Sequence, residues 1–182
     1  MIKTVILDLG GVCFTKGTRK AIKVISESYG VPREIVHSVL QGELGTKYRV
    51  SEITINELTI KANELWGTSI PVSELNQIWV SSYEPRPEVM ALISDLKESY
   101  ELLYLSDNVQ ERVNYLEGKY HFLKHFRDGV FSHNVGVRKP NPLIYQKVLE
   151  KTKSKPSECV YVDDKPRLLT PAKELGVNVI HF

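Results

Sequence analysis

The chain has 182 residues, a hydrophobic fraction of 42% and a formal net charge of +2. That length fits one domain with an insertion, and that composition supplies enough apolar side chains for a buried core. The weak positive charge, without a dense basic run, argues against nucleic-acid binding, and no apolar stretch reaches the roughly 18 residues of a membrane span.

A run of β-branched and apolar residues from Thr4 to Leu7 predicts a fully buried strand near the start of the chain. The run ends on a carboxylate, Asp8, which is followed by Gly10 and Gly11. Glycines here allow a sharp turn and a close approach of the backbone to a ligand. Because open parallel α/β sheets bind ligands beyond the carboxyl ends of their strands, we expect Asp8 at a site. A turn aspartate that caps the strand is the simpler alternative.

Residues 17–85 carry apolar side chains at helical spacing, with no strand pattern between them. We expect about four helices in this stretch, which is too long to be a loop in a compact domain. The sequence therefore predicts an all-helical cap subdomain over residues 17–85. The remaining residues, 1–16 and 86–182, are predicted to form the α/β core.

Inside the predicted cap, residues 42–50 are expected to form a loop, and Ser51 is expected to begin the next helix as its N-cap. The loop carries Lys47, Tyr48 and Arg49, which are candidates for substrate specificity if the loop faces the site. A solvated loop is the alternative. The basic cluster at residues 16–20 is expected to be a solvated face.

Four further strands are predicted at residues 101–105, 129–132, 159–162 and 177–180, with helices between them. This alternation implies right-handed crossovers and a parallel sheet. Polar residues then gather at the carboxyl edge of the sheet, and they are Ser106, Lys139, Asp163 and Asp164. Each one alone could be a cap or turn residue, but their convergence with Asp8 indicates a site.

The chemistry of this set is specific. Three carboxylates at one edge, those of Asp8, Asp163 and Asp164, repel one another unless a cation neutralises them. Oxygen ligands suit Mg²⁺, and the lack of His or Cys argues against zinc. The hydroxyl of Ser106, the ammonium of Lys139 and the amides of the glycine turn suit the oxygens of a phosphoryl group. A carboxylate beside Mg²⁺ can attack phosphorus and form an aspartyl phosphate.

These residues resemble the four motifs of the haloacid dehalogenase superfamily, in the same order and at the same strand ends. The motifs here are Asp8-Leu9-Gly10-Gly11-Val12, Leu105-Ser106-Asp107-Asn108, Arg138-Lys139-Pro140-Asn141-Pro142 and Val162-Asp163-Asp164. The resemblance covers nearly the whole chain, because the helical insertion resembles the cap that this family carries between its first and second motifs. It implies a Rossmann-like parallel five-stranded sheet in the order 5-4-1-2-3.

The resemblance also implies roles for single residues. Asp8 is the nucleophile and a Mg²⁺ ligand, Ser106 binds the transferring phosphoryl group, and Lys139 neutralises Asp8 and the phosphate. The metal is held by Asp164 and the Gly10 carbonyl, with Asp163 as a further ligand or as a support for the ligands. The remaining candidates for phosphate binding are Gly11, Asp107 and Asn108. Asp107 and Asn108 are also expected to cap the helix after the second strand.

By resemblance, the chain is a Mg²⁺-dependent phosphatase of small phosphorylated metabolites, with sugar phosphates among the candidates. We expect a cytoplasmic monomer or homodimer, with no nucleic-acid or membrane partner. Two cysteines, Cys13 and Cys159, are too few for a disulfide framework and fit a reduced compartment.

Gly10 departs from the family pattern, because phosphatases of this family carry an aspartate there that acts as general acid and base. A good leaving group could make the acid unnecessary, or a cap residue, a substrate hydroxyl or water could replace it. The chain could instead be a 2-haloacid dehalogenase, or a catalytically weak phosphate-binding protein. The pair Asp163 and Asp164 favours a metal, and so a phosphatase. Leu168 is a second departure, in a region where relatives carry Asp or Asn.

Overall fold

The computed structural model describes all 182 residues and contains one five-stranded parallel sheet in the order β3-β2-β1-β4-β5. This is the predicted order 5-4-1-2-3 read from the other edge, so the predicted fold class is confirmed. The strands are β1 (Thr4–Leu7), β2 (Glu101–Ser106), β3 (Asp128–Phe131), β4 (Cys159–Asp163) and β5 (Asn178–His181). Leu7 pairs with Tyr104 of β2 and Val162 of β4, so Asp8 follows the central strand between two neighbouring strand ends.

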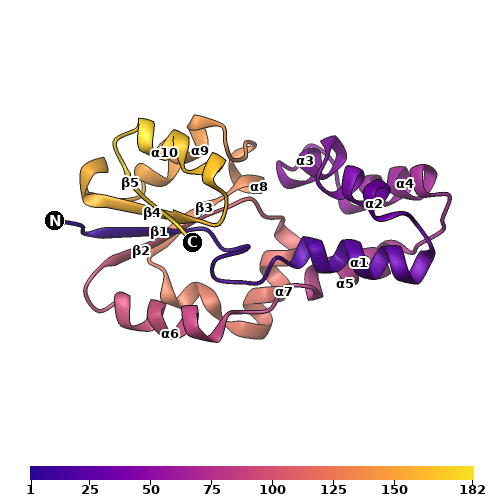
Figure 1. Cartoon of the computed structure of the whole chain (residues 1–182), viewed down its shortest axis with the longest axis horizontal. Helices are drawn as coiled ribbons and strands as arrows, with labels where there is room; N and C mark the ends of the chain where they lie inside the picture. Colours follow the sequence, from indigo (N-terminus) through magenta and orange to yellow (C-terminus); the bar gives the residue numbers. More distant parts are fainter.

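Alternate residues of the strands pack against two helical layers (Figure 1). Val5 and Leu7 of β1 belong to a core formed with α6 (Pro87–Leu96) and α7 (Gln110–Tyr120). Ile6 faces the other way and packs with α9 (Pro142–Leu149) and α10 (Thr170–Glu174). Burial on both faces explains why the strands read as continuous apolar runs. The short elements are η1 (Phe122–His125), α8 (Ser132–Val135), η2 (Pro156–Glu158) and η3 (Pro166–Leu168).

Five helices lie between β1 and α6, which we call the helical segment. They are α1 (Gly17–Tyr29), α2 (Arg33–Leu40), α3 (Glu43–Arg49), α4 (Ile55–Trp66) and α5 (Val72–Ser81). Figure 1 shows them beyond the carboxyl ends of the strands, next to the start of α7. All five fall inside residues 17–85, and the division of the chain into a core and a cap at those boundaries stays a prediction.

The expected loop at residues 42–50 is wrong, because α3 occupies most of it. Gly42 and Gly45 favoured a loop, yet a Cβ at Gly45 would lie 2.1 Å from the carbonyl oxygen of Leu40, so glycine there permits close packing. An ion pair between Glu43 and Lys47, 2.6 Å apart and one turn along the helix, supports α3.

The predicted N-caps of two helices are also wrong. Thr54, not Ser51, caps α4, because its hydroxyl accepts from the amide of Glu57 while that glutamate accepts from the Thr54 amide, a capping box. The helix after β2 has Val109 as its N-cap residue, with no side-chain cap, so Asp107 and Asn108 do not cap it.

Two segments connect the sheet to the helical segment, and they are hydrogen-bonded to each other. The Thr15 amide donates to the Glu84 carbonyl at 2.8 Å, and the Arg86 amide donates to the Cys13 carbonyl at 2.9 Å. The ring of Tyr83 packs against the backbone of Gly17, where a Cβ would lie 2.3 Å from the ring. The two chain connections between the sheet and the helical segment therefore form one paired strip of backbone.

Cys13 and Cys159 are both buried free thiols. No helix of the protein is long and apolar enough to cross a membrane.

Candidate active site

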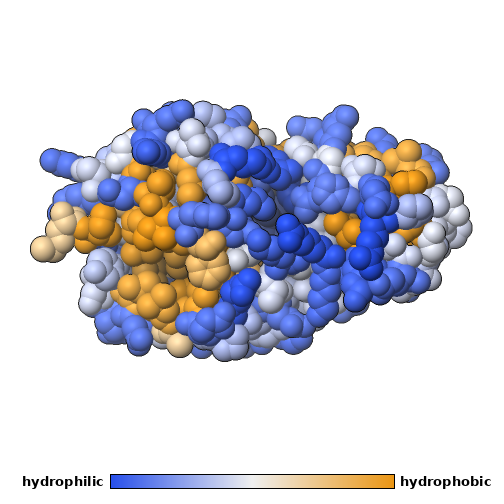
Figure 2. All heavy atoms as spheres, viewed as in Figure 1, coloured by the Kyte–Doolittle hydropathy of each residue, from blue (hydrophilic) through white to orange (hydrophobic).

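A cavity of about 530 Å³ lies where the carboxyl edge of the sheet meets the helical segment. Figure 2 shows hydrophilic residues gathered over this junction, around a hollow in the surface. The core contributes residues from all four predicted motifs, and the helical segment contributes polar residues from α1, from the end of α2 and from α3. The lining includes Asp8, Gly10, Ser106, Asp107, Asn108, Arg138, Lys139, Asp164, Lys16, Thr18, Arg19, Gln41 and Arg49.

Asp8 is held in place by two donors on the same oxygen. Its Oδ1 accepts from the Leu9 amide at 2.7 Å and lies 3.0 Å from the Lys139 ammonium. Burial raises the pKa of Asp8 to about 6, although the charge of Lys139 opposes this rise and that of Asp163 adds to it. The second oxygen, Oδ2, takes part in neither contact.

Lys139 lies at the centre of the acidic cluster. Its Nζ is 2.7 Å from Asp163 Oδ2, 2.9 Å from the Tyr161 hydroxyl and 3.3 Å from the Leu105 carbonyl. Burial alone would lower the pKa of Lys139, but the negative charges of Asp8 and Asp163 dominate and hold that pKa well above its usual value. Lys139 is therefore a permanent cation beside the Asp8 carboxylate.

Asp163 is occupied by protein partners. Its Oδ2 accepts from Lys139 and from the hydroxyl of Tyr161, and its Oδ1 accepts from the Lys165 amide at 2.9 Å. The residue is fully buried. Of the two roles expected for Asp163, this bonding favours support of Lys139 over direct metal ligation.

Asp164 offers the oxygens that a cation would need. Both of its carboxylate oxygens are buried without a hydrogen bond of good geometry, although Lys16 Nζ lies 2.7 Å from Oδ2. Oxygens of Asp8, Asp163 and Asp164 lie within 4.8 Å of one another. Three carboxylates this close together repel one another unless cations neutralise them, and an all-oxygen set of this kind fits Mg²⁺.

The two glycines after Asp8 serve different purposes. Gly11 has φ +109°, and a Cβ there would lie 2.6 Å from the Asp164 carboxyl carbon, so this glycine makes room for the acid. Its amide donates to the Phe14 carbonyl at 2.7 Å, so it is not directed at a phosphate. A Cβ at Gly10 would meet only Tyr83, at an ordinary 3.6 Å.

The three polar residues of the motif after β2 make different contacts. Ser106 is buried and lines the cavity near Lys139. Asp107 accepts from the Lys139 amide and from Arg138 Nε, both at 3.0 Å, so it fixes the segment that carries Lys139. Asn108 Oδ1 accepts from Val109 and from Arg112 Nη1, the latter at 3.1 Å.

The three candidates for substrate specificity in the helical segment lie in three different environments. Lys47 pairs with Glu43 at the surface, so this side chain is solvated. Tyr48 is buried, and its hydroxyl donates to Glu111 at 2.9 Å. Only Arg49 lines the cavity, where its Nη1 donates to the carbonyls of Leu40 and Gly45 at 2.9 and 2.8 Å.

Sequence reasoning missed several residues of the site. Lys16, expected on a solvated face, reaches Asp164, and Tyr161 lies inside the strand that precedes Asp163. Arg112 is buried at the cavity wall. A tyrosine that precedes Asp163 by two strand positions shares its side of the sheet, and that spacing was the available signal for Tyr161.

A parallel α/β sheet that brings a buried aspartate, a lysine and a second acidic pair to one edge is typical of Rossmann-like hydrolases. The model of the haloacid dehalogenase-like hydrolases matches residues 2–176. The chain belongs to this family.

Three known proteins illustrate the range of this family. D-ribitol-5-phosphate phosphatase of Bacteroides thetaiotaomicron is 24% identical over 186 residues, which cover 97% of this chain and 89% of that protein. A HAD family enzyme of the same organism, solved with magnesium and inorganic phosphate, shares the fold with a TM-score of 0.80 and 21% identity, covering 100% and 94% of the two chains. L-2-haloacid dehalogenase of Xanthobacter autotrophicus has a TM-score of 0.75 at 18% identity, with coverage of 100% and 77%.

Proposed function

We propose that this protein is a Mg²⁺-dependent phosphatase of small phosphorylated metabolites that works through an aspartyl phosphate on Asp8. The observation that carries the proposal is the cluster of three buried carboxylates, in which Asp164 lies within 4.8 Å of oxygens of Asp8 and Asp163 and contacts the ammonium of Lys16. A dehalogenase needs no cation at such a cluster, whereas a phosphatase does. The relationship to D-ribitol-5-phosphate phosphatase supports the same choice and makes sugar and polyol phosphates candidate substrates.

The residues suggest two chemical steps. In the first, Oδ2 of Asp8 attacks phosphorus, the bond from phosphorus to the leaving oxygen breaks, and the alcohol departs with a proton from solvent or substrate. In the second, water attacks the acyl phosphate, releasing inorganic phosphate and restoring the Asp8 carboxylate. Lys139, 3.0 Å from Oδ1, keeps Asp8 ionised and offsets the charge of the phosphoryl oxygens. Ser106 is the proposed hydroxyl donor to those oxygens.

When bound, Mg²⁺ would neutralise the phosphoryl group and the carboxylates. Asp8 and Asp164 would hold it with the Gly10 carbonyl, while Asp163 orients Lys139. Asp107, which positions Lys139 through the amide, and Gly11, which makes room for Asp164, would shape the site without touching phosphate. Asn108 lines the cavity and is the remaining candidate for phosphate contact.

The test compares purified wild-type protein with Asp8→Asn protein on a panel of phosphate esters, with Mg²⁺ or with EDTA. We expect phosphate release by the wild type in Mg²⁺ alone, and none by Asp8→Asn, because the amide is a poor nucleophile. Circular dichroism and thermal unfolding verify that the variant is folded. Phosphate release by folded Asp8→Asn protein would refute the mechanism.

The same assay distinguishes the 2-haloacid dehalogenase that Gly10 left open. Halide release from 2-chloropropionate that persists in EDTA would replace the proposal with that activity. Retained phosphate binding without turnover of any ester would instead indicate a phosphate-binding protein.

A further inference from the structure

Two arginine side chains lie buried at the cavity wall, away from the acidic cluster. Arg112, on the first turn of α7, is 2% exposed, and Arg49, at the end of α3, is 4% exposed. One comes from the core and the other from the helical segment, and both line the cavity. They flank the ring of Trp79, with guanidinium carbons 5.1 and 5.2 Å from its centroid.

The Arg112 guanidinium is only partly satisfied. Its Nη1 donates to Asn108 Oδ1 at 3.1 Å, and its central carbon lies 4.4 Å from the centroid of the Tyr83 ring. Its Nε and Nη2 are buried without any acceptor. Buried donors of a charged group are nearly always hydrogen-bonded, so two idle donors at a cavity wall point to an acceptor that binds there.

No carboxylate of the protein supplies that acceptor. The nearby acids are engaged elsewhere, since Asp107 pairs with Arg138 at 3.0 Å and Glu111 accepts from Tyr48 at 2.9 Å. Arg49 uses Nη1 to bind two backbone carbonyls, which carry no full charge. Burial and the neighbouring charge of Arg112 lower the pKa of Arg49 to about 10, as expected for two cations without an anion between them.

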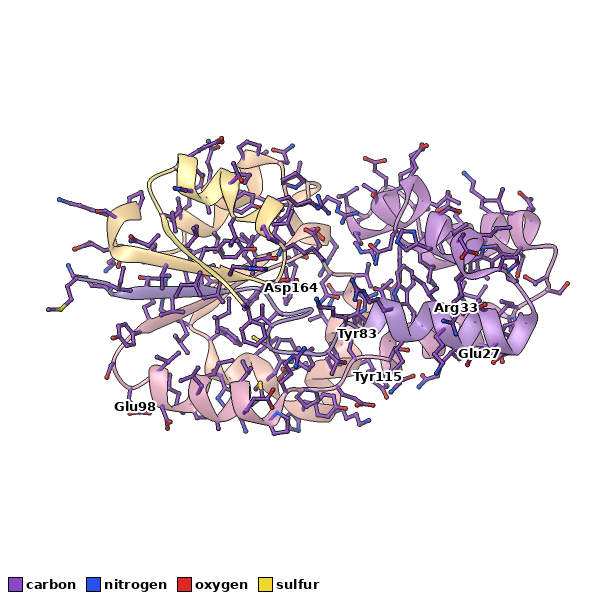
Figure 3. The ribbon with its side chains drawn as sticks, in the orientation of Figure 1. Glu27, Arg33, Tyr83, Glu98, Tyr115 and Asp164 are labelled. Carbon is purple, nitrogen blue, oxygen red and sulfur yellow. The ribbon has the colours of Figure 1, made fainter.

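The Asp8 and Lys139 cluster already accounts for one anionic group of a substrate. Asn108 connects the two regions, because it is the last residue of the motif that contains Ser106 and its Oδ1 accepts from Arg112, four residues further along the chain. A single small molecule within the cavity of about 530 Å³ can therefore contact both regions. Tyr83 and Asp164, labelled in Figure 3, mark the junction where the two regions meet.

We propose that Arg112 and Arg49 form a second anion-binding subsite, and that the substrate is a phosphate monoester with a further oxyanion, a carboxylate or a second phosphate. This inference rests on the proposed function, since it adds the second anion to the phosphate that Asp8 attacks. Planar guanidinium groups bind the paired oxygens of carboxylate and phosphate well. The subsite would select among metabolites that share a phosphate.

The test uses phosphonates, whose carbon–phosphorus bond the enzyme cannot hydrolyse, so binding is measured without turnover. Isothermal titration with Mg²⁺ present compares ethylphosphonate with phosphonoacetate, and propylphosphonate with 3-phosphonopropionate. Propane-1,3-diphosphonate adds the second phosphate-like group. We expect at least one member with an anion at both ends to bind about tenfold or more tightly than its alkyl counterpart, the scale of a charged hydrogen bond.

Arg112→Gln should remove most of that preference, because a neutral amide loses the charged donors, and it should weaken binding of the ligand with two anionic ends more than binding of its alkyl counterpart. Arg112→Lys should restore part of that preference. The matched control is Arg33→Gln, which removes an exposed arginine paired with Glu27 on the far side of the helical segment and should leave the preference unchanged (Figure 3).

Equal wild-type affinities within every pair would overturn the second subsite and leave the phosphatase proposal intact. A full preference retained by folded Arg112→Gln protein would overturn the subsite as well. The wild-type comparison decides the matter even if the variant does not fold. Absence of phosphonate binding, together with no phosphate release from any ester, would overturn both proposals.

Discussion

Replacing Gly10 by aspartate should convert the enzyme toward general acid–base catalysis. Gly10 lacks a positive φ, and a Cβ there would be 3.6 Å from Tyr83, so the new side chain meets no backbone strain and no clash. A glycine replaced at such a position can even gain about 0.4–1 kcal/mol from the unfolded chain, so we expect folded protein. A positioned acid typically contributes about 10²–10⁴-fold, or about 3–5 kcal/mol of the barrier.

That gain should depend on the leaving group. Alkyl phosphates need a proton in the transition state, so Gly10→Asp should accelerate them by most of this factor. Aryl phosphates leave easily and should change little. Single-turnover rates across a series of esters, plotted against leaving-group pKa, measure the effect as a flatter slope. In the parent enzyme the slope should be steep, and good leaving groups should give a burst, because position 10 carries no carboxylate to act as a general base on water in the second step.

Gly10→Asn is the matched control, because it has nearly the same shape but cannot give up a proton. An equal acceleration by Gly10→Asn would show that packing, not proton transfer, caused the change. A shallow slope in the parent enzyme would refute the reasoning differently, since another group would then already donate the proton.

Four further substitutions test the separate roles of residues at the carboxyl edge. Asp164→Ala should weaken Mg²⁺ activation by about tenfold or more, whereas Asp163→Ala should mainly lower the free energy of unfolding, by about 3–5 kcal/mol, because it leaves the buried Lys139 charge with one partner fewer. Mg²⁺ titration and urea unfolding of both variants check this. A larger Mg²⁺ effect for Asp163→Ala would reverse the assignment. Gly11→Ala should destabilise the protein by about 1–3 kcal/mol and also weaken Mg²⁺ activation, because φ +109° is strained and the methyl group meets Asp164; unchanged urea unfolding would contradict it. Tyr161→Phe should lower the free energy of unfolding by about 1–3 kcal/mol, because Asp163 and Lys139 lose a buried hydrogen-bond partner; an unaltered urea midpoint would argue against this role.

The sequence was most informative where one physical rule dominates. Apolar runs such as Thr4 to Leu7 are buried on both faces, so the strands and their parallel direction could be predicted, whereas the strand order came from the resemblance to the family. Polar residues after those runs, Asp8 and Asp164 among them, share an edge because parallel strands end together. Topology, not local propensity, carried these predictions.

It was least informative where a tertiary contact decides the outcome. Helix α3 contains Gly45 because the carbonyl of Leu40, at the end of another helix, leaves no room for a side chain there. Lys16 looked like one more surface cation until the fold brought it to Asp164. Arg112 is charged and yet buried, and only the assembled cavity reveals why its position matters.

The paired backbone strip between the sheet and the helices has a mechanical consequence. Because Thr15 and Glu84 are bonded across it, the two connections cannot slide past each other, so a movement of the helices relative to the sheet would pivot at this strip and would break the Tyr48–Glu111 hydrogen bond. Such a movement would carry Arg49 with the helices and leave Asp8 with the sheet and Arg112 with α7. Such a movement would pull the Arg49 guanidinium away from a molecule bound at the proposed second anion subsite, so that product release and the loss of this contact would occur together.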